Sequence, residues 1–245
     1  ATYAAWNWKA NGSGSSNTTG SINTTATSAN VDAGFSIVAY EATGSAGTVG
    51  HGLSKAPEMI IVKHRDQAGT SWTTYYGDNT DYLRLNSTVA TIDAVEAWND
   101  TSPSATLFSV GANGGDSNNT SGGSTIAYCF HSVDGYSKVG SYTGNGNADG
   151  TFVYTGFRPA FVMIKRTDSA NSWHIIDTQR DTDNIAQYPL LADTSGAESS
   201  YAGSYYDVLS NGFKMRNTYA DHNADGGTYI YLAFAETPFK YSNAR

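Results

Sequence analysis

The chain has 245 residues, of which 39% are hydrophobic, 13% are aromatic and only 15% are charged, with a formal net charge of -8 at pH 7. This hydrophobic content excludes an intrinsically disordered chain, and the low content of Lys and Arg (14, against 22 Asp and Glu) argues against nucleic-acid binding. No stretch approaches the 18 apolar residues that a membrane-spanning helix needs. The single cysteine, Cys129, cannot form an intrachain disulfide, and we expect it to be a small buried hydrophobic residue.

Residues 1–9 have the form of a β-strand that closes a repeated unit, although nothing precedes it. Two explanations remain open: the chain was cut from a longer parent protein, or this strand pairs within the present fold. Residues 10–33 consist of Gly, Ser, Asn, Thr and Ala with one charged residue, Asp32. Such a composition predicts an extended or surface-lying connection that contributes almost nothing to a core.

Short β-branched and aromatic segments follow, bounded by turn residues. Phe35–Tyr40 is the first of these predicted strands. Met59–Lys63 and Phe161–Lys165 are continuous apolar runs, which are typical of central strands covered on both faces. The segments that begin at Trp72 and Trp173 come after short polar loops, so each is predicted to form a hairpin with the strand before it.

The chain also repeats itself. Equivalent segments are separated by about 102 positions, and repetition at this period predicts a small array of similar folding units. We therefore predict an all-β fold with two tandem, related, sandwich-like units behind an N-terminal strand and linker. The predicted boundaries are 1–33 for the strand and linker, 34–138 for the first unit and 139–245 for the second. The matching segments are 57–63 with 159–165, 107–111 with 208–212, and 126–130 with 230–234.

No catalytic signature occurs in the sequence, which lacks GxSxG, HExxH, P-loop and paired-cysteine patterns. The five histidines are scattered without metal-ligand spacing. Glycoside hydrolases need two carboxylates at a set separation, and the candidate glutamates lie in different local contexts. We predict a protein that is not an enzyme, with a glycan hydrolase as the alternative. The glutamates considered are Glu58, Glu96, Glu198 and Glu236.

Asn147–Gly150 and Asn223–Gly226 are identical tetrapeptides. An Asp-Gly pair supplies the positive φ that tight turns require, so the first interpretation of both is a turn. A calcium site would use several carboxylates, and each tetrapeptide has one. Asp149 and Asp225 are kept as weak calcium-ligand candidates, and no other cofactor is predicted.

Aromatic residues divide into expected core anchors and expected ligand contacts. Trp72 and Trp173 occupy matching positions in the two units, which favours a core role. Aromatic rings in polar, loop-like stretches can instead stack on the apolar faces of sugar rings, while nearby Asn and Asp bind hydroxyls. The candidate glycan-binding residues are Trp98, Tyr201, Tyr205, Tyr206 and Tyr219.

Five motifs occur in order along the chain: Ala5–Lys9, Gly34–Val38, Val49–Leu53, Thr155–Pro159 and Pro238–Arg245. Together they resemble a repeat-bearing family of tailed-phage structural proteins, which is common in marine phages, including those of cyanobacteria. The resemblance implies a tail fibre or spike component on the virion surface that contacts other virion proteins. It carries no catalytic residues.

A fibre component would contact host surface polysaccharide through weak sites repeated on a symmetric assembly, which gives avidity. By analogy with fibre components, which are often trimers, we expect a homo-oligomer. A capsid or tail decoration protein without a host ligand is the first alternative, and a polysaccharide depolymerase is the second. The sequence does not identify the host, the glycan or the place on the particle.

Overall fold

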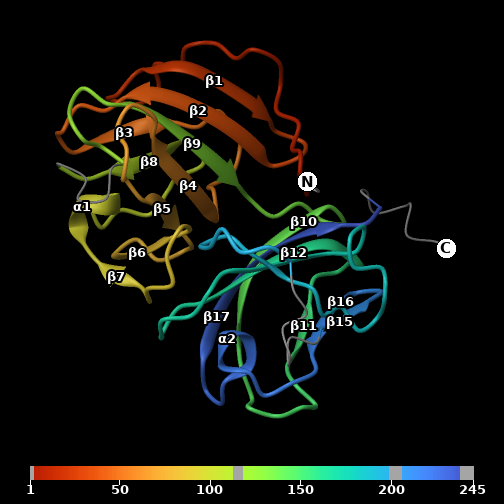
Figure 1. Cartoon of the computed structure of the whole chain (residues 1–245). Coiled ribbons are helices and arrows are strands. Elements are labelled where there is room, and N and C mark those ends of the chain that lie inside the picture. Colours follow the sequence, from red (N-terminus) through yellow and green to blue (C-terminus); the bar gives the residue numbers. More distant parts are fainter. Residues whose placement is uncertain (1–2, 113–117, 199–205, 238–245) are drawn as a thin grey trace. The chain divides into compact units, whose positions relative to one another are not determined.

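Residues 3–112, 118–198 and 206–237 are described by the computed structural model, and they are almost entirely strand and loop (Figure 1). The chain divides into two compact units. The first comprises residues 1–85 and 91–131, and the second comprises residues 86–90 and 132–245. Each unit holds a larger and a smaller antiparallel sheet, which confirms the all-β, sandwich-like fold. No helix within the described ranges is long and apolar enough to cross a membrane.

The larger sheet of the first unit has seven strands in the order β1-β2-β9-β4-β5-β6-β7. Strand β4 is central, as its apolar run predicts, and β5 follows it as the second arm of a hairpin. The smaller sheet pairs β3 with β8. The bounds are β1 Thr24–Asn30, β2 Phe35–Glu41, β3 Gly47–Gly50, β4 Met59–His64, β5 Trp72–Tyr75, β6 Asp81–Arg84, β7 Ile92–Asp93, α1 Val95–Trp98, β8 Leu107–Val110 and β9 Ser124–Phe130.

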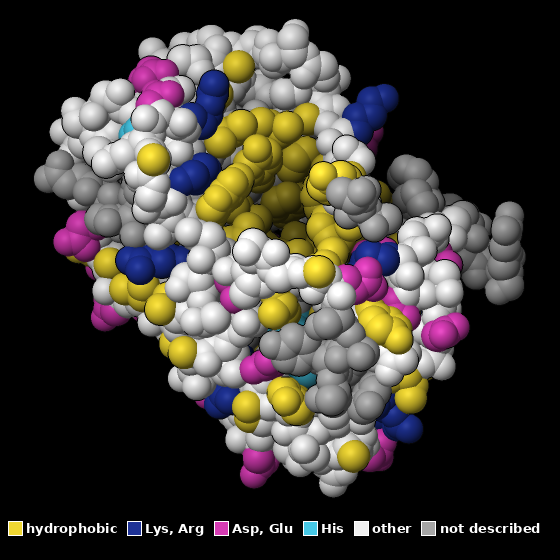
Figure 2. All heavy atoms as spheres, viewed as in Figure 1, with side chains coloured by type: hydrophobic (Ala, Val, Ile, Leu, Met, Phe, Trp, Pro, Cys, Tyr) yellow, Lys and Arg dark blue, Asp and Glu magenta, His cyan; other side chains and the backbone are white. Residues whose placement is uncertain are grey.

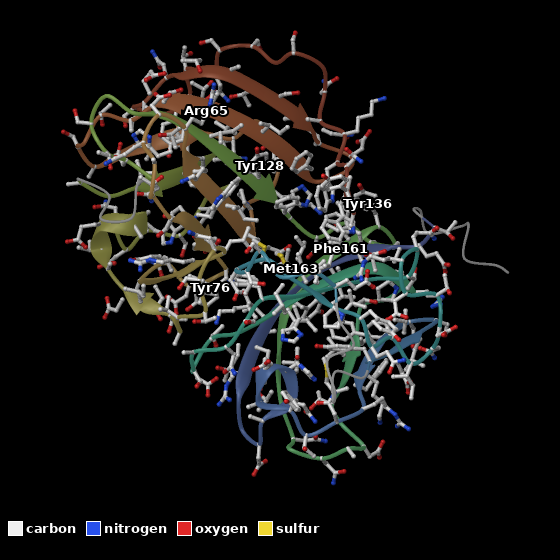
Figure 3. The ribbon with its side chains drawn as sticks, viewed as in Figure 1. Arg65, Tyr76, Tyr128, Tyr136, Phe161 and Met163 are labelled. Atoms are coloured by element: carbon white, nitrogen blue, oxygen red, sulfur yellow. The ribbon has the colours of Figure 1, made fainter. Side chains whose placement is uncertain are left out.

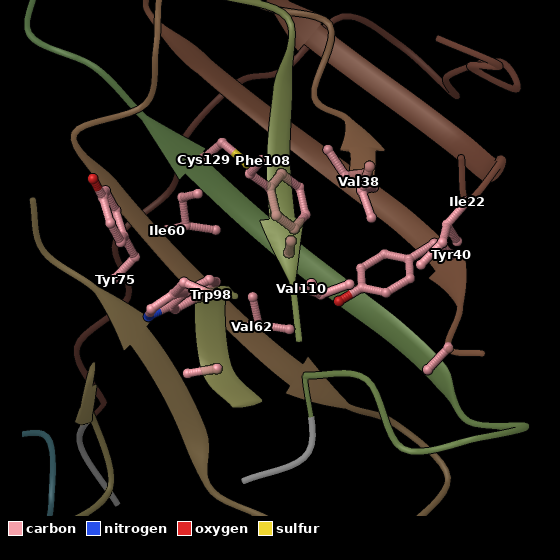
Figure 4. Packing of buried hydrophobic residues seen from close by; sticks show 14 of the residues in the cluster. Ile22, Val38, Tyr40, Ile60, Val62, Tyr75, Trp98, Phe108, Val110 and Cys129 are labelled. Carbon is pink, nitrogen blue, oxygen red and sulfur yellow. The ribbon is translucent and has the colours of Figure 1, made fainter. Parts of the chain in front are cut away.

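One hydrophobic core joins the two sheets of the first unit (Figure 4). Ile60 and Cys129 enter this core from the larger sheet, and Phe108 enters it from β8. Burial raises the pKa of the Cys129 thiol to about 12, so this cysteine is the inert, buried residue that the sequence predicts. Trp98 of α1 joins the same core, with its ring edge-on to Tyr75 at 5.5 Å between centroids.

The larger sheet of the second unit has five strands in the order β10-β17-β12-β13-β14, and the smaller has three in the order β11-β16-β15. The core between them includes Ile164 and Phe213. On the other face of β12 lie Phe161 and Met163 (Figure 3). The Phe161 ring is 6.1 Å from that of Phe234. The bounds are β10 Ser137–Thr143, β11 Phe152–Tyr154, β12 Pro159–Arg166, β13 His174–Asp177, β14 Leu190–Leu191, β15 Tyr206–Leu209, β16 Gly212–Met215, α2 Ala220–Asn223 and β17 Thr228–Ala235.

The two units repeat one arrangement of strands. The order β2-β9-β4-β5 recurs as β10-β17-β12-β13, and the pair β3-β8 recurs as β11-β16. The registers agree as well: Val62 pairs with Thr73, and Ile164 pairs with His174 at the equivalent place. One sequence match is wrong, because β8 corresponds to β16 and not to residues 208–212. Strand β15 pairs with β16 as an additional strand of the second unit. Its short apolar sequence is similar to that of β8, which explains the wrong match.

Residues 10–33 contribute more to the first unit than their composition predicts. Residues 24–30 form β1, which pairs with β2 through backbone hydrogen bonds that any side chain permits. Ile22 is 6% exposed and lies in the core. The prediction of a mere linker is therefore wrong for this segment. Residues 3–10 form no strand, so the explanation that this segment pairs as a strand within the present fold is wrong.

The boundary between the units lies near residue 131, not at residue 138 as predicted. Strand β10 begins at Ser137 and pairs with β17 of the second unit, so a boundary at 138 would cut through a strand. Residues 86–90 also belong to the second unit, where the carbonyl of Thr88 accepts the N–H of Asn171 at 2.8 Å. A segment of this length is too short for its amino-acid composition to predict which unit it belongs to.

Candidate functional site

The structure places the described glycan-binding candidates in two different environments. Trp98 and Tyr206 are each 1% exposed, so the prediction that their rings face solvent is wrong. Tyr219 is 43% exposed and remains available for stacking. Tyr201 and Tyr205 lie outside the described residues. Trp173 is fully buried, which confirms its predicted core role, and Trp72 is partly buried with its ring stacked near Tyr128 at 6.5 Å.

Tyr206 belongs to a buried polar network in the second unit. Nε2 of His174 lies 3.2 Å from one carboxylate oxygen of Asp221, and Nδ2 of Asn171 donates to the other at 2.5 Å. The hydroxyl of Tyr206 lies 3.5 Å from Nδ1 of His174. The hydrogen bond from His174 lowers the pKa of Asp221, and burial raises the pKa of Tyr206. His174 and Tyr206 are buried and the side chain of Asp221 is 19% exposed, so this network fastens β13 to α2 mainly from the interior of the second unit.

The two identical tetrapeptides have different surroundings. Asp149 is exposed and forms ion pairs with Lys214 at 2.8 Å and Arg216 at 3.4 Å; its hydrogen bond to Lys214 lowers the pKa of the Asp149 carboxyl. Asp225 is exposed at a turn whose Gly226 has φ +68°. Within the described ranges no group of three or more His, Cys, Asp or Glu side chains could hold a metal ion. The calcium interpretation stays a prediction.

Two of the glutamates considered for hydrolysis form ion pairs with arginines of the second unit. Glu236 forms an ion pair with Arg158 at 3.0 Å, and Glu198 forms one with Arg180 at 2.7 Å. Glu58 and Glu96 belong to the first unit, whereas Glu198 and Glu236 belong to the second. None of the four lines the pocket described next.

The second unit contains a surface pocket of about 360 Å³, which we call the β10–β11 groove. One wall comes from residues 132–138, the turn before β10 and the start of that strand. The other wall comes from residues 154–156, the end of β11 and the turn after it. The lining combines hydroxyls, one carboxylate, one ammonium and one aromatic ring. It consists of Ser132, Asp134, Gly135, Ser137, Lys138, Tyr154, Thr155 and Gly156.

Backbone contacts fix the wall that carries the aromatic ring. The carbonyl of Asn211 accepts the N–H groups of Thr155 at 3.0 Å and Gly156 at 3.2 Å. Gly156 has φ +88°, a conformation that an L-residue adopts only with strain. These contacts hold Tyr154, 65% exposed, at the edge of the groove. The ring is thus presented by a fixed backbone.

The groove of the second unit lies at the position that strand β1 fills in the first unit. Gly52 of the first unit is equivalent to Gly156, and a Cβ at Gly52 would lie 2.8 Å from Thr27 and 3.1 Å from Ala29, both in β1. Strand β1 therefore fills this side of the first sandwich. The second unit has no counterpart of β1 among its described strands, and β10 is the edge of its sheet. The duplication leaves the equivalent space open.

The exposed edge of β10 is largely capped by side chains. Oγ of Ser132 accepts the N–H of Val139 at 3.0 Å and lies 3.5 Å from its carbonyl oxygen. Oγ1 of Thr151 donates to the carbonyl of Thr143 at 2.8 Å. Strand addition needs free N–H and C=O groups along an edge, and these caps occupy them. The groove is therefore better suited to a ligand that is recognised by side chains.

Sequence reasoning missed Tyr154, although a signal was present. The register of β3 with β8 and of β11 with β16 makes Gly50 equivalent to Tyr154 and Thr48 equivalent to Phe152. Both aromatic residues of the second unit are exposed, Phe152 at 42% and Tyr154 at 65%. Aligning the two halves and asking where small residues became aromatic would have found this strand.

No curated protein and no solved structure matches the chain. One family model matches residues 1–238, and its description is a domain of unknown function, DUF7483. This match covers both units and almost the whole sequence. The chain therefore belongs to the DUF7483 family.

Proposed function

We propose that this chain is a surface protein of a tailed-phage particle, a tail fibre or spike component, and that its second unit binds host surface glycans in the β10–β11 groove. The observation that carries the glycan proposal is Tyr154, whose ring is 65% exposed beside a polar groove of about 360 Å³. The placement on a phage particle rests on the sequence resemblance. Repeated weak sites on a homo-oligomer would supply the avidity that attachment needs.

The chemistry of the groove suits a sugar. An exposed aromatic ring offers an apolar face on which a pyranose ring can stack, with polar groups near its edge to fix orientation. Asp134 supplies acceptors for sugar hydroxyls, and the hydroxyl of Ser132 lies on the same wall. Charged residues are few over the whole chain, at 15%, so recognition would rely on stacking and hydrogen bonds.

Tyr154 is not needed by the fold, which strengthens a ligand role. The first unit builds the same strand with Gly50 at the equivalent position. An exposed ring gains little from burial, since most of its surface stays in water. A large aromatic residue kept in solvent beside a groove is more informative than an aromatic residue in a core.

The groove supports binding without hydrolysis. Glycoside hydrolysis uses two carboxyl groups about 5 to 9.5 Å apart, and Asp134 is the one carboxylate among the described lining residues. A depolymerase therefore ranks below a binding protein. A decoration protein without a host ligand would leave the exposure of Tyr154 unexplained.

The test compares Tyr154→Ala with Tyr188→Ala on a glycan array and on host cells. Tyr188 is 36% exposed and lies outside the groove, so it serves as the matched control. Wild type and Tyr188→Ala should bind, and Tyr154→Ala should lose roughly tenfold or more in affinity, as expected for a stacking residue worth about 1.5 kcal/mol. Equal glycan affinity of both variants would contradict the proposal that the β10–β11 groove binds the glycan. Silence on every glycan, with stable occupancy on purified particles, would favour the decoration protein, and release of reducing ends would favour the depolymerase.

A further inference from the structure

We infer that the groove selects acidic glycans, which carry a carboxylate or sulfate group, and that Lys138 binds this acidic group. This inference rests on the proposed glycan-binding function and adds the ligand class and a specificity-determining residue. Lys138 and Tyr154 line the same groove from opposite strands. A sugar stacked on Tyr154 would place a substituent toward Lys138.

Lys138 differs from the other cations of the second unit because its ammonium has no internal partner in the part of the chain that the structure describes. Arg158 pairs with Glu236, Arg180 with Asp177, and Lys214 with Asp149. No ion pair or hydrogen bond joins the ammonium of Lys138 to Asp134 or to any other described residue, although Lys138 and Asp134 both line the groove. An ammonium without an ion-pair partner on the wall of a groove can donate charge-assisted hydrogen bonds to a bound anion.

The fold does not require a lysine at this position. Lys138 pairs with Ala233 in the β10–β17 ladder, and the equivalent pair in the first unit is Ser36 with Cys129. Ser36 is fully buried in the first unit, whereas Lys138 is partly exposed. The same scaffold thus accepts a small polar residue where the second unit places a charge.

A second lysine pair shows what a structural lysine looks like in this protein. Lys63 and Lys165 are equivalent, and each ammonium donates to carbonyls of its own unit. Nζ of Lys63 donates to the carbonyl of Thr70 at 2.5 Å, and Nζ of Lys165 donates to that of Asn171 at 2.7 Å. Lys138 makes no such contact, which separates it from the lysines that the fold uses.

Long-range attraction would not explain a preference for acidic glycans. The chain carries a net charge of -8, and the face in Figure 2 shows Lys and Arg side chains scattered and not gathered into a basic patch. An acidic polymer would be repelled on approach and not steered in. Such a preference would come from a local contact, and Lys138 is the cation among the described residues that line the groove.

The experiment measures the affinity of the full chain for three probes of equal length. They are a polyuronate oligosaccharide, the same oligosaccharide with its carboxyl groups reduced to alcohols, and a sulfated neutral oligosaccharide. Wild type should bind at least one acidic probe roughly tenfold more tightly than the reduced probe, the size of one charge-assisted hydrogen bond. The two acidic probes distinguish carboxylate from sulfate.

Lys138→Gln should lower the affinity for the preferred acidic probe roughly tenfold, so that this preference disappears. Lys55→Gln, which removes an exposed lysine from the first unit, is the matched control and should keep the preference. Equal wild-type affinity for acidic and neutral probes, or a preference that survives Lys138→Gln, would overturn the inference while the proposed function stands. Failure to bind any probe, with array silence, would overturn both.

Discussion

Asn223 offers a sharp test of how the second unit is held together. This asparagine is fully buried at the end of α2. Its Oδ1 accepts the N–H of Asn145 at 3.1 Å, and its Nδ2 donates to the carbonyls of Asn147 at 2.8 Å and Asn217 at 2.7 Å. One side chain thereby ties the loop after β10 to the loop after β16.

Asn223→Ala should leave one N–H and two carbonyls without their partners, of which the bond to Asn217 is buried and the bonds to Asn145 and Asn147 are partly buried. Each buried polar group left unsatisfied costs about 1–3 kcal/mol, and water entering the vacated space recovers part of this. We therefore expect Asn223→Ala to lower the free energy of unfolding by about 2–4 kcal/mol. Exposed Asn147→Ala, whose Oδ1 accepts only the N–H of Asp149 among the described contacts, should cost about 1 kcal/mol or less.

The first unit contains an equivalent buried asparagine, Asn119, so the two units can be compared through one Asn→Ala variant in each. Asn119 is fully buried, accepts the N–H of Thr43 at 3.0 Å, and donates to the carbonyls of Ser45 at 2.8 Å and Gly111 at 2.7 Å. Because each unit has its own core, Asn119→Ala should destabilise the first unit and Asn223→Ala the second.

Chemical denaturation gives the total loss, and native-state hydrogen exchange assigns it to a unit. In Asn223→Ala, amides of β12 and β17 should lose protection while those of β4 and β9 keep it, and Asn119→Ala should show the reverse. A loss below about 1 kcal/mol for Asn223→Ala, or equal loss of protection in both units, would refute the argument.

Three further outcomes follow from burial, charge and exposure. Trp98→Ala removes a fully buried indole from the first core and should cost about 3–5 kcal/mol in urea denaturation; a small cost would show that Trp98 is not a core residue. The folded protein lowers the pKa of Asp221, so the stabilisation by its carboxylate is complete above the unfolded pKa of about 3.9 and is lost as the pH falls through the folded pKa. Asp221→Asn should therefore reduce the loss of unfolding free energy at acidic pH, and exposed Asp225→Asn should leave this loss unchanged. Tyr154→Ala should change the free energy of unfolding by less than about 0.5 kcal/mol, so a larger change would mean that its binding phenotype reflects folding.

The sequence by itself determined the duplication, the central strands and their hairpins. Continuous apolar runs such as Met59–Lys63 must be covered on both faces, and short polar loops leave antiparallel pairing as the simple connection. Burial of Cys129 and Trp173 follows from the same local patterns. These features depend on residues near one another in the chain, so local reasoning finds them.

Only the tertiary structure decided which surface of this scaffold is open. Residues 24–30 look like a linker, yet they pair through their backbone and close one sandwich. Trp98 and Tyr206 lie in polar stretches, yet strands brought from distant positions bury them. The β10–β11 groove exists because a strand present in one unit has no described counterpart in the other. Burial and openness are set by long-range packing, which the order of residues in a segment does not encode.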